Sequence, residues 1–234
     1  MHMHIADQSD IVVQARNVTL TLGTAEAPVE ILKGVDLDIR RGESVAVLGA
    51  SGSGKSSLMA VLSGLERASE GDVTIAGANF GKLDEDALAR ARRGHVGIIL
   101  QAFHLLPTMT ALENVAVPLE LAGHDRPFER AARELAEVGL AHRLDHYPSQ
   151  LSGGEQQRVA IARAMAPEPE IIFADEPTGN LDGKTSDAIS GLLFQRQLET
   201  QATLMLITHD KSLAERCDRI IEISDGLIAG QRSR

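Results

Sequence analysis

The sequence predicts an α/β protein built around a mainly parallel sheet, on three observations. Short apolar runs without polar alternation, such as Ser44–Gly49 and Thr203–Thr208, are typical of strands covered on both faces. Such runs alternate with helical segments, which predicts parallel strands joined by right-handed crossovers. The length of 234 residues suffices for one domain with a sizeable core, which we take as 1–234.

An antiparallel part precedes this sheet. Ile11–Leu22 is rich in β-branched residues, which favours a strand. Val29–Ile39 follows after a loop and alternates apolar with acidic residues, as expected for a strand with one face in water. Together with the short strand Gly71–Ile75, these segments predict an antiparallel β part.

A helical block interrupts the alternation of strands and helices. From Phe103 to about Gln150 the pattern is helical, with breaks at prolines such as Pro118, and Phe128–Val138 is the clearest helix. We therefore expect an inserted α-helical subdomain. The expected parts are an antiparallel part at 11–40 and 71–76, a central core at 41–101 and 156–234, and the helical subdomain at 102–155.

The composition excludes several classes of protein. Acidic residues outnumber basic ones by 33 to 23, and a formal net charge of −10 argues against a nucleic-acid partner. The single cysteine, Cys217, excludes an intramolecular disulfide and a zinc cluster of several thiolates, and it favours a reducing compartment. No apolar run approaches the ~20 residues of a membrane helix, and residues 1–10 lack the apolar core of a secretory signal. We expect a cytoplasmic protein whose membrane role, if any, comes through a partner.

A glycine-rich run after the first covered strand matches the phosphate-loop pattern G-x-x-x-x-G-K-[ST]. Its backbone N–H groups and the helix start near Lys55 would surround phosphate oxygens. Lys55 would contact the outer phosphates, and the Ser56 hydroxyl would bind Mg²⁺. The alternative is a glycine-rich turn with a chance Lys-Ser pair. The candidate nucleotide-binding residues are Gly49, Ala50, Ser51, Gly52, Ser53, Gly54, Lys55, Ser56 and Ser57.

Two carboxylates end the apolar strand Ile171–Ala174. Asp175 is placed to hold Mg²⁺ through water, and strand alternation predicts that Glu176 points to the opposite side. Glu176 is then available to polarise a water for attack on a γ-phosphate. The alternative is an acidic turn before Pro177.

A serine and two glycines open a later helix, at Ser152, Gly153 and Gly154. Ser152 suits an N-cap, and the glycines expose backbone N–H groups that could hold a second anion. The simpler alternative is a capping box between Ser152 and Glu155, which accounts for the serine and the acid but leaves both glycines unexplained.

The run Leu151–Gln157 resembles the signature motif of ABC ATPases, and the whole chain is similar to one ABC nucleotide-binding domain. Gln101 matches the Q-loop of that family, Gly179–Asp182 its D-loop and His209 its switch histidine. The run Phe173–Asp182 resembles the lipoprotein-release and macrolide-export branch. Within that branch the chain is most similar to YbbA-type ATPases, on the runs Leu144–His146 and Cys217–Arg219 and the missing N-terminal aromatic residue.

This resemblance implies a RecA-like P-loop NTPase core that hydrolyses ATP with Mg²⁺. Two copies would form a homodimer head to tail, with ATP sandwiched between the phosphate loop of one and the signature of the other. Glu176 would be the catalytic base, His209 would steady the γ-phosphate, and Gln101 would contact the metal and the attacking water. The implied metal ligands are Ser56, Gln101 and Asp175, and the contacts from the other copy are Ser152, Gly153, Gly154 and Asp182.

The resemblance also implies an integral membrane permease as partner, docking near Phe103–Val115 and holding the chain at the cytoplasmic face of the inner membrane. This segment is apolar for a region that follows a loop. We expect Phe103 and Met109 to be exposed contacts, whereas Leu105 and Leu112 fit the subdomain core equally well.

One departure from the family concerns the adenine base. Members usually stack it on an aromatic ring ahead of the phosphate loop, but Thr19–Gly23 contains none. We expect only apolar contact from Leu22, which would bind the adenine base more weakly than a stacked ring by about 1 kcal/mol. We therefore expect poor discrimination of ATP from GTP.

Other kinds of ATPase fit less well. DNA-repair types carry a long coiled coil between their two ATP motifs, and the spacing from Lys55 to Asp175 has no room for one. Translation types carry two cassettes in one chain, and the signature motif argues against a P-loop kinase or GTPase. A soluble or cell-division-type ABC ATPase that transmits force without transporting a substrate remains the alternative.

Overall fold

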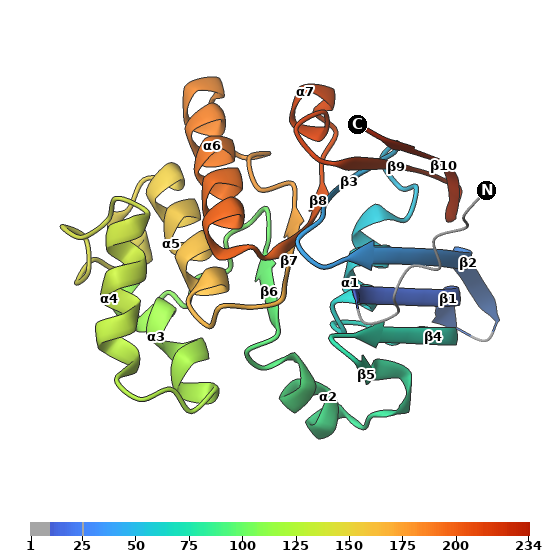
Figure 1. The fold of residues 1–234 in the computed structure, drawn as a ribbon, viewed down its shortest axis with the longest axis horizontal. Coiled ribbons are helices and arrows are strands. Elements are labelled where there is room, and N and C mark those ends of the chain that lie inside the picture. The colour runs from blue at the N-terminus through green and yellow to red at the C-terminus, as the bar shows by residue number, and fades with distance from the viewer. Residues whose placement is uncertain (1–9, 25) are drawn as a thin grey trace.

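The computed structural model describes residues 10–24 and 26–234, which form two sheets with one helix between them (Figure 1). Residues 1–9, on which the expected lack of a secretory signal rests, lie outside these ranges. Within the described ranges, no helix is long and apolar enough to cross a bilayer.

The first sheet is antiparallel, with strand order β2-β1-β4-β5. The β1–β2 hairpin is longer than the sequence predicts, because pairing continues through Gly23↔Pro28 to Thr24↔Ala27. The strands are β1 (Ile11–Thr24), β2 (Ala27–Arg40), β4 (Glu70–Ile75) and β5 (Ala78–Asn79).

The second sheet is mainly parallel, with strand order β10-β9-β3-β8-β7-β6. Only its edge strand β10 runs antiparallel to its neighbour. The strands are β3 (Ser44–Leu48), β6 (Val96–Ile99), β7 (Ile171–Asp175), β8 (Thr203–Ile207), β9 (Arg219–Ser224) and β10 (Leu227–Ser233). This arrangement confirms the predicted α/β class.

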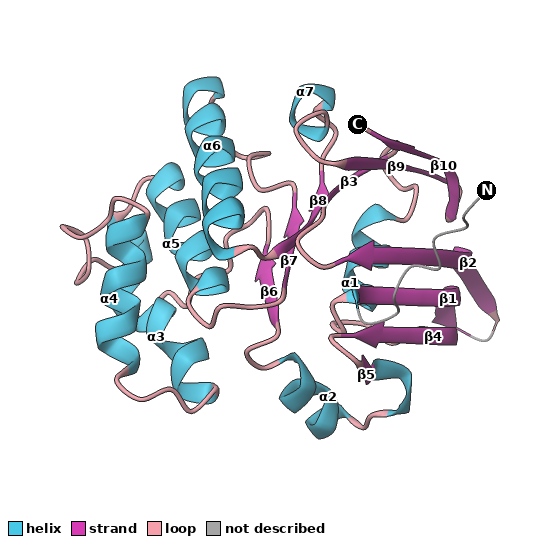
Figure 2. Cartoon of the chain, viewed as in Figure 1, coloured by secondary structure: helices cyan, strands magenta, loops and turns pink. Residues whose placement is uncertain are grey.

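The helices lie mostly on one side of the parallel sheet (Figure 2). Helix α1 (Lys55–Leu62) is the exception, since it contacts β1, β2 and β4 of one sheet and β7 of the other. The others are α2 (Glu85–Arg92), α3 (Ala111–Leu121), α4 (Pro127–Glu137), α5 (Gly153–Met165), α6 (Gly183–Thr200) and α7 (Lys211–Ala214), with 3-10 turns at Phe80–Lys82 and Pro148–Gln150.

Alternation along the covered strands divides the interior into two cores. Val45 and Val47 of β3 join α1 and the antiparallel sheet in one core, while Ala46 between them faces the helices α3–α6 in the other. Both faces of the strand are therefore buried, which is why its sequence shows no polar alternation. Cys217 belongs to the helical core, and burial raises the pKa of its thiol to about 12.

The predicted helical block begins later than expected. Residues 103–110 form a loop, because the buried Asn114 satisfies its backbone: Leu106 N–H donates to Asn114 Oδ1 at 2.7 Å, and Asn114 Nδ2 donates to the carbonyls of Leu106, Met109 and Thr110. The expected break at Pro118 is also wrong, since α3 continues through it to Leu121. A sequence pattern cannot show the loop at 103–110 or the continuation of α3 through Pro118, because both depend on packing against other segments.

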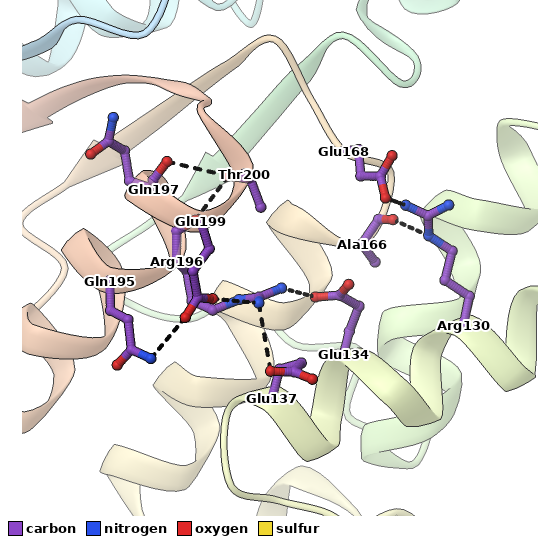
Figure 3. A network of polar contacts seen from close by, with 10 residues as sticks. All are labelled: Arg130, Glu134, Glu137, Ala166, Glu168, Gln195, Arg196, Gln197, Glu199 and Thr200. Atoms are coloured by element: carbon purple, nitrogen blue, oxygen red, sulfur yellow. Dashed lines mark hydrogen bonds and ion pairs between the residues drawn. The ribbon is translucent and has the colours of Figure 1, made fainter.

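A buried ion-pair network joins α4 to α6 (Figure 3). Arg196 on α6 is 8% exposed, and its guanidinium lies 2.7 Å from Glu134 of α4 and 2.9 Å from Glu199. Burial raises the pKa of Glu134 although Arg196 opposes the shift. The contact therefore fixes the orientation of the two helices more than it adds stability, since desolvation offsets much of the attraction.

Glu134→Ala is expected to lower the free energy of unfolding by about 3 kcal/mol, because it leaves a buried guanidinium without its nearest carboxylate. Urea unfolding followed by circular dichroism measures the change. Glu137→Ala is the control, since Glu137 lies 3.8 Å from Arg196 with a side chain 59% exposed, and its loss should cost less than about 0.5 kcal/mol. Equal losses in the two variants would contradict this assignment.

Candidate functional site

The glycine-rich loop joins the end of β3 to the start of α1, as the phosphate-loop pattern requires. Gly52 and Gly54 have φ of 79° and 102°, a left-handed conformation that glycine adopts without strain. Gly49 is restricted differently, because a β-carbon there would collide with the carbonyl oxygen of Ile223. Lys55 Nζ donates to the carbonyls of Gly49 and Ala50 at 2.9 and 2.8 Å, so the lysine lies over the loop.

A cavity of about 510 Å³ opens beside this loop, at the carboxyl ends of β3, β7 and β8. We call it the phosphate-loop cavity. This is the edge of a parallel sheet where ligands usually bind. Its lining residues are Ile31, Gly49, Ser51, Gly52, Gly54, Lys55, Ser56, Ser57, Gln101, Asp175, Glu176, Ile207 and His209. The structure thus brings the four predicted motifs into one site, while Ala50 and Ser53 belong to the loop without lining the cavity.

The expected opposite orientation of the two carboxylates is wrong, since both Asp175 and Glu176 line the cavity. Strand β7 ends at Asp175, and Glu176 has φ of 45°, outside the extended region, so strand alternation no longer applies to it. A left-handed glutamate stores strain, which is common at functional sites. His209 Nδ1 lies 2.9 and 3.0 Å from the two carboxylate oxygens of Glu176.

Residues that carry oxygen atoms suited to a divalent cation line the same cavity. Asp175 Oδ1 is buried and accepts no hydrogen bond from any described residue, although a buried carboxylate oxygen normally has a partner. The Ser56 hydroxyl and the Gln101 side-chain amide also line the cavity. Mg²⁺ prefers such oxygen ligands, so the residues present fit this ion.

Comparison with known proteins identifies the family. A family model described as "ABC transporter" matches residues 32–179. YbbA of Escherichia coli (strain K12), described as an uncharacterized ABC transporter ATP-binding protein, is 48% identical over 217 residues, which cover 92% of this chain and 95% of that protein. The chain belongs to the ABC transporter family.

Further relatives confirm the predicted branch. LolD of Alcanivorax borkumensis, a lipoprotein-releasing system ATP-binding protein, is 44% identical over 225 residues, covering 95% of this chain and 98% of LolD. MacB 1 of Aeromonas hydrophila, a macrolide export ATP-binding/permease protein, is 47% identical over 224 residues, or 95% of this chain and 34% of MacB 1.

A solved structure supports the fold. The dimeric ATP-binding cassette MJ0796, in a post-hydrolysis state bound to ADP and Pi, has a TM-score of 0.88 and 40% identity to this chain. The match covers 94% of this chain and 98% of that chain. It confirms the ABC ATPase cassette predicted from the sequence motifs, and ATP hydrolysis is the general activity of that family.

The ABC signature residues do not reach the phosphate-loop cavity of their own chain. Ser152 caps α5, where it accepts from the Glu155 N–H at 3.3 Å, and the Glu155 carboxylate accepts from the Ser152 N–H at 2.8 Å. This capping box lowers the pKa of Glu155. Gly154 has a packing reason, because a β-carbon there would lie 2.6 Å from Thr185 Cγ2 at the start of α6.

The D-loop ends at an N-cap. Asp182 accepts from the Thr185 N–H at 3.1 Å and from its hydroxyl at 2.7 Å, and these bonds lower the pKa of Asp182. Thr185 is therefore fixed on two sides, by Asp182 and by Gly154 of the ABC signature.

Leu22, the expected contact for adenine, is 43% exposed and does not line the cavity. The apolar residue that does is Ile31 on β2, which the sequence analysis missed. No sequence motif marks Ile31, because its place depends on how β2 lies against the phosphate loop. Poor discrimination of ATP from GTP by this ABC cassette remains a prediction.

Gly154→Ala is expected to lower the free energy of unfolding by about 1–3 kcal/mol through overpacking, although alanine normally favours a helix. Thr185→Ser removes the methyl that would clash and keeps the hydroxyl bonded to Asp182. In that background Gly154→Ala should become neutral or stabilising by about 0.5–1 kcal/mol. Chemical unfolding of the four proteins measures the coupling, and additive effects would contradict the packing reason for this glycine.

Proposed function

We propose that this ABC cassette is a Mg²⁺-dependent ATPase subunit that dimerises on ATP and drives a separate integral membrane permease. One observation carries the proposal. A lysine, a serine hydroxyl, two carboxylates and a histidine converge on one cavity at a glycine-rich helix start. This set suits phosphoryl transfer, where catalysis is mostly positioning and neutralisation of phosphate charge.

In this proposal Ser56, Asp175 and Gln101 hold Mg²⁺. When bound there, Mg²⁺ would supply positive charge that neutralises the phosphate oxygens. The buried Asp175 Oδ1, which lacks a partner among the described residues, supports the assignment. Lys55 leaves its bonds to the loop carbonyls of Gly49 and Ala50 for the outer phosphates of ATP.

Glu176 acts as the base that takes a proton from the attacking water. Its side chain is mostly buried, its backbone is left-handed, and the residue lines the cavity. His209 is the only described residue within hydrogen-bond distance of that carboxylate. It restrains the orientation of Glu176, and it lines the cavity in which the γ-phosphate would lie.

Dimerisation completes the site from outside. Ser152, Gly153 and Gly154 lie away from their own cavity, at a helix start whose N–H groups attract an anion. A second copy placed head to tail, with Asp182 near the contact, would set these groups against the γ-phosphate. The dimeric relative bound to ADP and Pi supports this arrangement. ATP then holds two halves together until hydrolysis removes the charge that attracts them.

The permease is proposed to dock in a second hollow, of about 470 Å³, which we call the α3 groove. Its described lining is apolar and cationic with no acidic residue, although the chain as a whole carries −10. It therefore fits an amphipathic cytoplasmic helix with acidic side chains, at the cytoplasmic face of the inner membrane. The lining includes Arg92, Arg93, His104, Leu106, Val117, Pro118, Leu121 and Arg163.

The expected exposure of Phe103 and Met109 is wrong, since both are half-buried. Arg163 donates to the carbonyls of Phe103 and His104 at 2.8 and 2.6 Å, which holds both residues in left-handed conformations and turns Phe103 toward Gly153. Leu106 is the exposed apolar side chain of this loop, at 42%. Leu105 and Leu112 pack against the helical core.

Glu176→Gln is expected to bind ATP with near-native affinity and to hydrolyse it at least 100-fold more slowly, because the amide cannot take the proton. The variant should accumulate as a dimer with ATP and Mg²⁺ in size-exclusion chromatography. Lys55→Ala is the control, and it should lose nucleotide binding by calorimetry and stay monomeric. A Glu176→Gln protein that remains monomeric at saturating ATP would contradict the proposed function.

Leu106→Glu is expected to reduce recovery of a co-purifying integral membrane protein at least tenfold, because it places a negative charge in the apolar part of the α3 groove, where it would repel an acidic partner helix. The measurement is affinity purification from detergent-solubilised native membranes, with the bound protein identified by mass spectrometry. Leu198→Glu on α6, where Leu198 is 65% exposed and lies outside the groove, is the matched control. Equal recovery with both variants would place the contact elsewhere.

A further inference from the structure

The D-loop binds the Q-loop within one chain, through the side-chain amides of Asn180 and Gln101. Asn180 Nδ2 donates to the backbone carbonyl of Gln101 at 2.9 Å. The Gln101 side chain forms a second hydrogen bond, in which its Nε2 donates to Asn180 Oδ1 at 3.2 Å. The pair connects segments 79 residues apart, and no catalytic assignment made above uses Asn180.

This pairing fixes which atom of each amide faces which way. A backbone carbonyl can only accept, so the group of Asn180 that faces it must be the NH₂. The remaining atom of Asn180, Oδ1, can only accept, so Gln101 must present its own NH₂ to it. Gln101 Oε1 is then the amide atom that bonds to no described residue, and Gln101 lines the phosphate-loop cavity.

The neighbouring backbone keeps Asn180 in place. A β-carbon on Gly179 would lie 2.8 Å from Gln101 Nε2, so a side chain there would displace the Gln101 amide from its present position. Gly179 N–H donates to the Glu176 carbonyl at 3.0 Å, and Leu181 N–H donates to Thr178 at 3.1 Å. Asn180 therefore lies in a hydrogen-bonded turn that begins at Glu176, the proposed base.

We propose that Asn180 is a positioning residue that turns the Gln101 amide so that Oε1, and not the NH₂, faces the cation in the cavity. The inference rests on the proposed function, in which Gln101 is a Mg²⁺ ligand. Mg²⁺ takes oxygen ligands, whereas an amide NH₂ turned toward it would repel it. Partners that orient a metal ligand in this way typically change metal affinity or activity 10–100-fold when removed.

The test is calorimetry of a non-hydrolysable ATP analogue with wild type and Asn180→Ala, in Mg²⁺ and in EDTA. We expect the variant to bind about tenfold more weakly in Mg²⁺ and equally well in EDTA. The magnesium concentration that gives half-maximal ATPase should rise by a similar factor. Equal binding in EDTA shows a folded site, and Asn180→Ser, whose hydroxyl is too short to bridge both groups, provides a second variant.

A double-mutant cycle separates positioning from a general structural role. If Asn180 acts through Gln101, then Asn180→Ala should add no further loss of Mg²⁺-dependent affinity to Gln101→Ala. Asn79→Ala is the control, because the Asn79 amide donates to Asp72 at 2.9 Å on the antiparallel sheet, outside the cavity.

Two results would overturn the inference while leaving the proposed function intact. One is wild-type Mg²⁺ dependence in both Asn180 variants, and the other is fully additive losses in the double variant. Failure of the wild-type protein to bind the analogue with Mg²⁺ would instead overturn the proposed function, and this inference with it.

Discussion

The whole site depends on one geometric constraint, the turn by which β3 passes into α1. Glycines in the left-handed region let the chain reverse there, so that α1 begins at Lys55 with its N-terminus facing the cavity. Helix α1 is also the element held between the two sheets, in contact with β1 and β7. The phosphate-binding end of the helix therefore cannot shift without disturbing the apolar core that the two sheets share around α1.

Local sequence was sufficient wherever a motif is continuous. The phosphate loop, the covered strands and the capping box at Ser152 each follow from residues close together in the chain, and the structure contains them. The family comparisons confirm the fold class and the ABC cassette derived from those motifs. Such features are predictable because their geometry is fixed by backbone conformation and by hydrogen bonds within a few residues.

What the sequence did not show depends on contacts between distant segments. Ile31 reaches the cavity from another sheet, and Asn114 replaces an expected helix with a loop. The orientation of Glu176 follows from where β7 ends, one residue earlier than strand alternation assumes. The pairing of Gln101 with Asn180 is of the same kind, since neither amide has a marked local preference for the other.

The two hydrogen bonds of Arg163 link α5 to the loop at Phe103 and His104. Its guanidinium binds backbone carbonyls beside the α3 groove. Ser152 caps the other end of the same helix, about 16 Å from Arg163 at a rise of 1.5 Å per residue. Helix α5 is continuous from Gly153 to Met165, so its two ends move together. Burial lowers the pKa of Arg163, and no carboxylate among the described residues pairs with its guanidinium to oppose that shift. In the proposed dimer, a shift of the loop at Phe103 and His104 would be carried along α5 to the ABC signature at its other end.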